Sequence, residues 1–310
     1  MVRRIWTVLR SRAPFVRAVP KITSWSLVSL VAGLMLALAG CRGVPDVALT
    51  DLTEARRLMA DLRIQFTKAA DASNRAVMAD TDEQSIAFAH EAEQATAAVG
   101  NDAAALAPRL HDLGYPPEVR LLEEFNKHFA NYRTLDHDVL QLAVENTNLK
   151  AQRLSFGPVR EAADAFRDAL EPLGAKAKDH CRVESLAAKA VLAVRDIQVL
   201  QAPHIAEADD AAMARMEAEM HGLEVTAGEA LDRISALVEP AAQPQLALAS
   251  AALARFKDLS AQIVTLSRRN SNVRSLSLSL REKPVLIAAC DDSLRSLADA
   301  LAKEGFTATR

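Results

Sequence analysis

An internal duplication restricts the fold of this chain more than any other feature of its sequence. Residues 129–135 resemble residues 253–259, and residues 145–150 resemble residues 269–274. In both comparisons the second segment follows the first by 124 positions without a gap. A match of this length and regularity predicts that one structural unit occurs twice in the chain.

Both copies carry the periodicity of amphipathic helices. Apolar residues recur every three or four positions, and strict alternation is nearly absent. Half of the 310 residues are hydrophobic but only 4% are aromatic, which favours Ala-rich helical packing over a β-sandwich. Residues 275–280 alternate Ser and Leu, yet their counterparts at 151–156 do not, so we predict a helix there as well. The expected fold class is all-α.

Turn residues, Gly and Pro divide each copy into four predicted helices. The breaks of the first copy lie at residues 80–82, 114–117 and 157–158. Thr81 and Gln84 form a capping box, so we expect the second helix to begin there. The second copy has similar breaks, the last of them near Pro284. These breaks predict two tandem up-and-down four-helix bundles with long helices, in residues 49–178 and 179–310.

The third helix of each copy contains an asparagine inside its apolar stripe. The stripe keeps its spacing of three and four residues through Asn146 and through Asn270. We therefore predict a helix that continues through each asparagine, because a turn would not need to preserve the spacing. The alternative places a turn at each asparagine, a residue that tolerates turn conformations.

Residues 1–40 have the features of a secretory signal. Six basic residues and no acidic residue precede an apolar stretch that ends in Leu-Ala-Gly-Cys at 38–41. This ending resembles the lipobox of bacterial lipoproteins. The resemblance implies cleavage after Gly40, lipidation of Cys41 and a lipidated linker at 41–48. The alternative is an uncleaved transmembrane anchor. Arg42, where an aspartate would signal retention in the inner membrane, favours the outer membrane.

The charge of the mature chain limits its partners. Without residues 1–40 the chain has 31 basic and 40 acidic residues, a net charge near −9. This balance argues against nucleic acid and makes the lipid, not electrostatics, the membrane attachment. We expect the periplasmic face of the cell envelope. Cys181 and Cys290 either form a disulfide in this oxidising compartment or are two buried thiols.

The predicted bundles resemble the four-helix-bundle sensor domain of methyl-accepting chemotaxis receptors. The likeness consists of Ala-rich amphipathic helices, the acidic turn at 80–83 and the segment 142–151 of the third helix. It covers both copies, but no second transmembrane helix or cytoplasmic signalling hairpin accompanies them. The resemblance implies a non-enzymatic module that senses or binds a ligand. The alternative is a scaffold lipoprotein that presents helices to an envelope protein.

The asparagines are the best candidates for a binding site. A buried asparagine must satisfy its amide, and one reading is a polar layer that fixes the register between helices. The other reading is a small polar ligand, whose carboxylate a nearby cation would bind. The candidate residues of that site are Asn146, Asn148 and Lys150 in the first copy and Asn270, Asn272 and Arg274 in the second.

Histidine spacing gives little support to a metal site. A di-iron bundle needs Glu-x-x-His, and no histidine here has a glutamate three residues before it. His204 and Glu207 resemble part of the Gly-x-His-x-x-Glu motif of imelysin-like lipoproteins, although Ala202 replaces the glycine. No nucleophile elbow or phosphate loop occurs. We predict no metal, no cofactor and no enzymatic activity.

Overall fold

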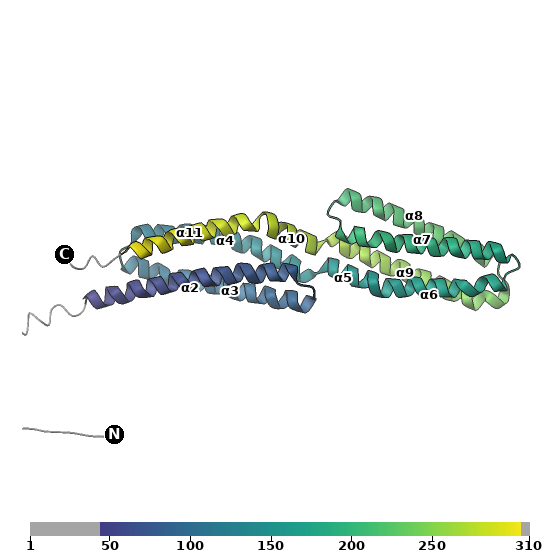
Figure 1. Cartoon of the computed structure of the whole chain (residues 1–310), viewed down its shortest axis with the longest axis horizontal. Coiled ribbons are helices and arrows are strands. Elements are labelled where there is room, and N and C mark those ends of the chain that lie inside the picture. The colour runs from purple at the N-terminus through teal and green to yellow at the C-terminus, as the bar shows by residue number, and fades with distance from the viewer. Residues whose placement is uncertain (1–43, 305–310) are drawn as a thin grey trace, which may run out of the picture. The chain divides into compact units, whose positions relative to one another are not determined.

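The computed structural model describes residues 44–304, apart from the side chains of residues 44–48 and Lys176, and shows an all-α protein (Figure 1). Within that range there is no β-strand, and a single isolated bridge joins Ala177 to Val238. The predicted fold class is confirmed. The signal segment and Cys41 lie outside the described residues. No helix of the described part is long and apolar enough to cross a membrane.

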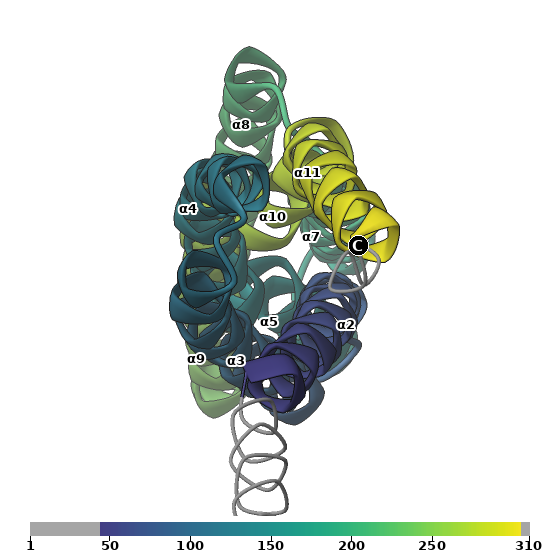
Figure 2. The same cartoon turned by 90° about the vertical axis from the view of Figure 1, so that its left-hand side faces the viewer.

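One group of helices, here called the α2 bundle, comes from both ends of the described chain. Its members are α2 (Val44–Met78), α3 (Asp82–Asp112), α4 (Pro116–Glu145), α10 (Ser271–Arg281) and α11 (Lys283–Lys303). The end-on view shows α11 between α4 and α2 (Figure 2). Leu62, Leu106, Phe125 and Leu294, from four of these helices, share one buried core. Phe66 stands edge-on to Phe125, with 6.3 Å between ring centroids.

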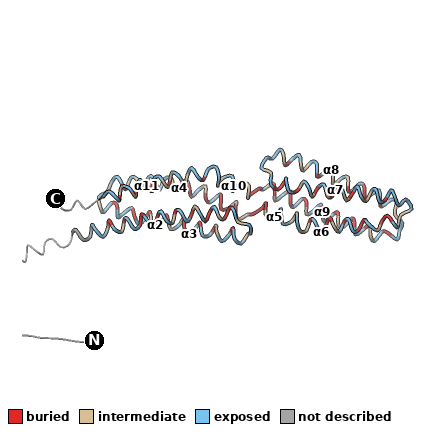
Figure 3. The backbone as a smooth tube through the Cα atoms, in the orientation of Figure 1, coloured by how far each residue is buried: buried red, intermediate tan, exposed pale blue. Residues whose placement is uncertain are grey.

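The second group, here called the α7 bundle, contains the middle of the chain. Its members are α5 (Thr147–Leu154), the π-helix η1 (Ser155–Val159), α6 (Arg160–Leu170), α7 (His180–Ala206), α8 (Asp210–Ser235) and α9 (Gln243–Arg269). The 3-10 helices η2 (Glu171–Lys176) and η3 (Pro240–Ala242) lie in its connections. Phe166, Ile197, Ala230 and Phe256 belong to its core. In both bundles the buried residues follow the inward faces of the helices (Figure 3).

The two bundles exchange their last helices. In sequence order, α2 to α6 form the first copy and α7 to α11 the second, but α11 packs on α4 and α6 packs on α9. The predicted segments 49–178 and 179–310 therefore do not each form a separate bundle. Each copy supplies three helices to one bundle and its fourth helix to the other. All of these helices from Asp51 onward belong to one contact unit.

The prediction of a continuous third helix was wrong at the asparagines. Asn146 has φ 49° and ψ 38°, and Asn270 has φ 54° and ψ 38°, so each adopts the left-handed conformation between two helices. The alternative, a turn, is not what the structure shows either. In Figure 1 the chain passes from α4 into α5, and from α9 into α10, without reversing direction. One left-handed residue interrupts each helix and leads the chain into the other bundle.

Of the other predictions about helix boundaries, some are confirmed and one is wrong. Thr81 caps α3 by accepting a hydrogen bond from the Gln84 backbone NH at 3.2 Å, as predicted. Gly114, at φ 68°, ends α3. The predicted break at residues 157–158 was wrong, because the π-helix η1 carries the chain past Pro158 into α6. Residues 275–280 are helical, as predicted.

Candidate functional site

The candidate asparagines meet where the segment that joins α4 to α5 crosses the segment that joins α9 to α10. This place is called the crossing below. The Asn148 backbone NH donates to Asn272 Oδ1 and the Asn272 NH donates to Asn148 Oδ1, both at 3.1 Å. Asn148 Nδ2 donates to Asn270 Oδ1 at 2.7 Å, and Asn272 Nδ2 donates to Asn146 Oδ1 at 2.8 Å. The first NH groups of α5 and α10 would otherwise lack partners, and the side chains of the opposite copy supply them.

The residues beside these asparagines complete the same two-fold pattern. The Thr147 NH donates to Ser271 Oγ at 3.1 Å, and the Ser271 NH donates to Thr147 Oγ1 at 3.0 Å. Asn146 Nδ2 is buried without a hydrogen-bond partner. A cavity of about 230 Å³ touches Asn148, but its other lining is mainly apolar. The crossing therefore has the geometry of a polar layer that fixes register.

Lys150 and Arg274, the cations predicted to bind a ligand, lie among protein groups at this crossing. Lys150 Nζ donates to the Glu145 carbonyl at 2.8 Å and so caps the end of α4. Arg269 pairs with the Glu145 carboxylate, and this hydrogen bond is the main cause that lowers the pKa of Glu145. Arg274 lies in the same neighbourhood and adds a smaller electrostatic effect on that pKa. The candidate residues are thus brought together, but by contacts between helices.

A buried ion pair lies inside the α2 bundle, and the sequence analysis missed it. Lys283 and Asp136 have 0% and 3% exposed side chains, and Nζ lies 2.7 Å from Oδ1. Ser73 Oγ donates to the same Asp136 oxygen at 2.6 Å. Burial lowers the pKa of Lys283, and the Asp136 carboxylate opposes that change. The position of Lys283 before Pro284, in a predicted break, had given no sign of burial.

His204 belongs to a buried network in the α7 bundle. Its Nε2 lies 2.8 Å from Glu217 Oε1, and its Nδ1 lies 2.9 Å from Ser267 Oγ. Arg268 also binds Glu217, and this hydrogen bond is the first cause that lowers the pKa of Glu217. Ser267 is fully buried and donates to the Ile263 carbonyl. This serine, histidine and glutamate therefore join helices and present no accessible nucleophile.

The imelysin-like pair does not converge. Glu207 accepts hydrogen bonds from the backbone NH groups of Ala208 and Asp209, both at 2.8 Å, just before α8. His204 contacts Glu217 instead. In the described part of the chain, no group of three or more His, Cys, Asp or Glu side chains could hold a metal ion.

The two cysteines do not form the disulfide that was considered. Cys181 is exposed on α7, Cys290 is buried on α11, and both are free. Burial raises the pKa of the Cys290 thiol to about 12, so this thiol is unreactive at neutral pH. The alternative of two buried thiols holds only for Cys290.

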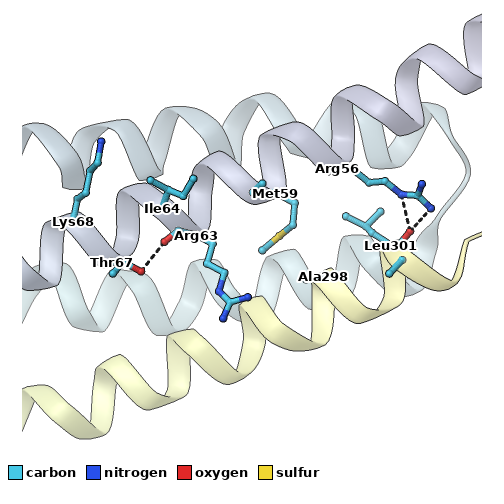
Figure 4. Close-up of a pocket in the computed structure, with 10 residues that line it drawn as sticks. Arg56, Met59, Arg63, Ile64, Thr67, Lys68, Ala298 and Leu301 are labelled. Carbon is cyan, nitrogen blue, oxygen red and sulfur yellow. Dashed lines mark hydrogen bonds between the residues drawn. The ribbon is translucent and has the colours of Figure 1, made fainter.

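An open groove between α2 and α11 is the clearest candidate for binding a ligand (Figure 4). It has a volume of about 770 Å³, within the usual range for small-molecule sites. Its lining consists of the basic residues Arg56, Arg63 and Lys68, of Thr67, and of Met59, Ala60, Ile64, Ala298, Leu301 and Ala302. An apolar surface with a few polar groups is typical of a small-molecule site.

The basic residues of the groove differ in their partners. Arg56 Nε and Nη2 donate to the Leu301 carbonyl at 3.1 and 2.9 Å, and Nη2 also donates to the Glu304 carbonyl at 2.8 Å. Within residues 51–304, no carboxylate lies within 4.0 Å of the charged nitrogens of Arg63 or Lys68. The sequence analysis missed this groove, because its two walls lie more than 200 residues apart.

Comparisons with known proteins identify no relative. No protein-family model matches the chain, and no similar sequence was found among the curated proteins.

Proposed function

We propose that this protein is a non-enzymatic, ligand-binding module of the bacterial cell envelope, tethered by lipid on Cys41. The observation that carries the proposal is the groove between α2 and α11, which combines small-molecule size, an apolar surface and two cations, Arg63 and Lys68, that have no carboxylate partner among residues 51–304. The signal-like segment that ends at Cys41 supports a periplasmic position, with the outer membrane favoured. The likeness to chemoreceptor sensor domains supports a sensory role.

The groove is also connected to the rest of the fold. Its second wall, α11, follows α10, and α10 begins at the crossing with α5. A ligand held between α2 and α11 would therefore contact α11, which is linked through α10 to the crossing where the two bundles meet. This connection supports sensing over simple storage, because a shift of α11 would strain the hydrogen bonds of the crossing.

A thermal-shift screen of the full chain against organic acids, amino acids, fatty acids and divalent metals tests the proposal. A ligand at 100 times its dissociation constant should add about 2.7 kcal/mol to the free energy of unfolding. Ala298→Trp, which fills the groove, should abolish the shift. Ala247→Trp, on an exposed position of α9, should leave it intact. If every shift survives Ala298→Trp, or none occurs, the groove is not the binding site.

The lipid tether has its own test. Labelled palmitate should enter the wild-type chain and should not enter Cys41→Ala. Labelling that persists in the variant would contradict the tether.

The alternative function, a scaffold, is favoured by the outer face of α7. Leu192 and Val199 lie two turns apart on this helix and are 63% and 72% exposed. A pair of large apolar side chains on one helix face could receive a partner helix. A photo-crosslinker at position 199 should then capture one envelope protein, and Leu192→Glu should prevent the capture.

A further inference from the structure

We infer that the groove between α2 and α11 binds a free long-chain fatty acid, with Arg63 at the carboxylate, Lys68 adding positive charge at the same end and the acyl chain along the apolar floor. The inference rests on the proposed function and names the class of its ligand. It starts from charge: the lining holds three basic side chains and no acidic one, although the mature chain is predicted to be acidic. An anion is the complementary occupant.

The ion pairs of the acidic residues on α2 also favour an anionic ligand in the groove. Glu54 and Asp61 pair with Arg57, and Asp71 pairs with Arg75, outside the groove. These three carboxylates therefore neutralise other arginines and leave the groove cations available.

The shape of the groove fits a narrow chain. Ala60, Ala298 and Ala302 are small and leave space between α2 and α11 unfilled, while Met59 and Leu301 form apolar walls. Ile64 is 51% exposed at the edge, so apolar surface remains uncovered. From Arg56 to Lys68 the groove follows α2 for about 18 Å, at 1.5 Å per residue.

The two ends of the groove differ, which gives the ligand a direction. At one end the Arg56 guanidinium is already bound to the Leu301 and Glu304 carbonyls and joins α2 to α11. In Figure 4, Arg63 extends from α2 toward α11, whereas the Lys68 side chain, further from Arg56 along the same helix, points away from α11. The carboxylate is therefore expected at Arg63, with Lys68 adding positive charge at that end of the groove, and the end of the acyl chain near Arg56.

A larger hollow between α3 and α4 does not have this chemistry. Its volume is about 940 Å³, but its lining mixes the acidic residues Glu93, Asp136 and Asp138 with Arg133. Three carboxylates against one guanidinium make its lining acidic, and its surface is more polar, so it offers no comparable site for an anionic, apolar ligand.

Photo-crosslinking tests the inference on the full-length chain in phosphatidylcholine nanodiscs. A diazirine analogue of palmitate should label peptides that contain residues 59–68 and 298–302. Excess palmitate should prevent this labelling, whereas hexadecyltrimethylammonium, with the same chain and the opposite charge, should not. Ala298→Trp should abolish it.

Charge-reversal variants test the role of the two cations. Arg63→Glu with Lys68→Glu should reduce labelling of the groove roughly tenfold or more, since a charge-assisted interaction becomes a repulsion. Lys189→Glu with Arg215→Glu, two exposed positions on α7 and α8, should leave it unchanged. Circular dichroism verifies that both double variants and Ala298→Trp keep their helical content.

Several outcomes would overturn the inference. They are equal labelling after charge reversal, equal competition by the cationic analogue, preferential labelling by a photoactivatable phosphatidylglycerol, or labelling confined to residues 1–43. If one of these outcomes occurs and another ligand class gives a thermal shift that Ala298→Trp abolishes, the fatty acid is excluded and the binding function stands. If one of them occurs and no ligand gives such a shift, both proposals fail.

Discussion

At the scale of single residues, the pair of Lys283 and Asp136 is the most unusual feature of the α2 bundle. Both charges are removed from water, and each relies on the other and on Ser73 for compensation. Removing one partner of such a pair leaves a charge buried, which costs far more than removing both. The pair links α4, α11 and α2, so it also favours this choice of helix partners.

We predict strong coupling between these two side chains. Lys283→Met alone should lower the free energy of unfolding by about 3–5 kcal/mol, because Asp136 remains charged and buried. Adding Asp136→Asn, which still accepts from Ser73, should recover most of the loss. Urea unfolding followed by circular dichroism measures both values.

A solvent-exposed ion pair provides the control for these two variants. Arg295→Met removes the partner of Asp292, where both side chains are at least 60% exposed, and should cost no more than about 1 kcal/mol. A double variant as unstable as Lys283→Met alone would show that the two buried charges are not coupled.

At the scale of elements, Asn146 and Asn270 decide the course of the long helices. Asparagine occupies the left-handed conformation more readily than most residues, because its short amide forms local hydrogen bonds. One such residue interrupts the helical hydrogen bonds but does not reverse the chain. The Lys150 NH donates to the Asn146 carbonyl at 3.0 Å, so α5 begins at once.

We predict that Asn146→Gly is more stable than Asn146→Ala. Both variants lose the bond from Asn272, but alanine at φ 49° also carries a penalty of about 1–2 kcal/mol. A continuous helix would give the opposite order, since glycine in a helix interior costs about 1 kcal/mol relative to alanine. Thermal unfolding of the two variants gives the sign directly.

A substitution in a regular helix is the control for this order of stabilities. Ala130→Gly, at an exposed site in α4, should destabilise the chain by roughly the helix penalty of glycine. If Asn146→Ala is the more stable of the two position-146 variants, the left-handed assignment is refuted.

At the scale of the whole molecule, the exchange of α6 and α11 makes the two halves of the sequence depend on each other. Neither copy holds a complete bundle, since the fourth helix of each packs in the other. The link between the copies, at η2 and the start of α7, lies in the α7 bundle and far in sequence from the crossing.

We predict that the chain remains assembled after cleavage between the copies. A protease site inserted after Lys178, an exposed residue before α7, should yield fragments 1–178 and 179–310. These fragments should co-elute in native buffer, because each buries one helix in the other's bundle, and should separate in urea. Size-exclusion chromatography measures this. Separation into two helical fragments in native buffer would instead support independent tandem bundles.

The all-α class, most of the helix ends and the importance of the asparagines could be predicted from the amino-acid sequence alone. Local chemistry suffices for these features: Thr81 caps α3, Gly114 takes a positive φ, and the apolar period marks the buried face of each helix. The repeat also predicts equivalent backbone conformations at Asn146 and Asn270, and their matching dihedral angles agree with this.

The pairing of the helices, and the sites that this pairing creates, could not be predicted and follow from the packing of the folded chain. Periodicity shows that a helix face is buried but does not show which helix covers it. The exchange of α6 and α11, the pair of Lys283 with Asp136, and the groove between α2 and α11 all join residues more than 70 positions apart. These features depend on packing between distant segments, which a local pattern does not encode.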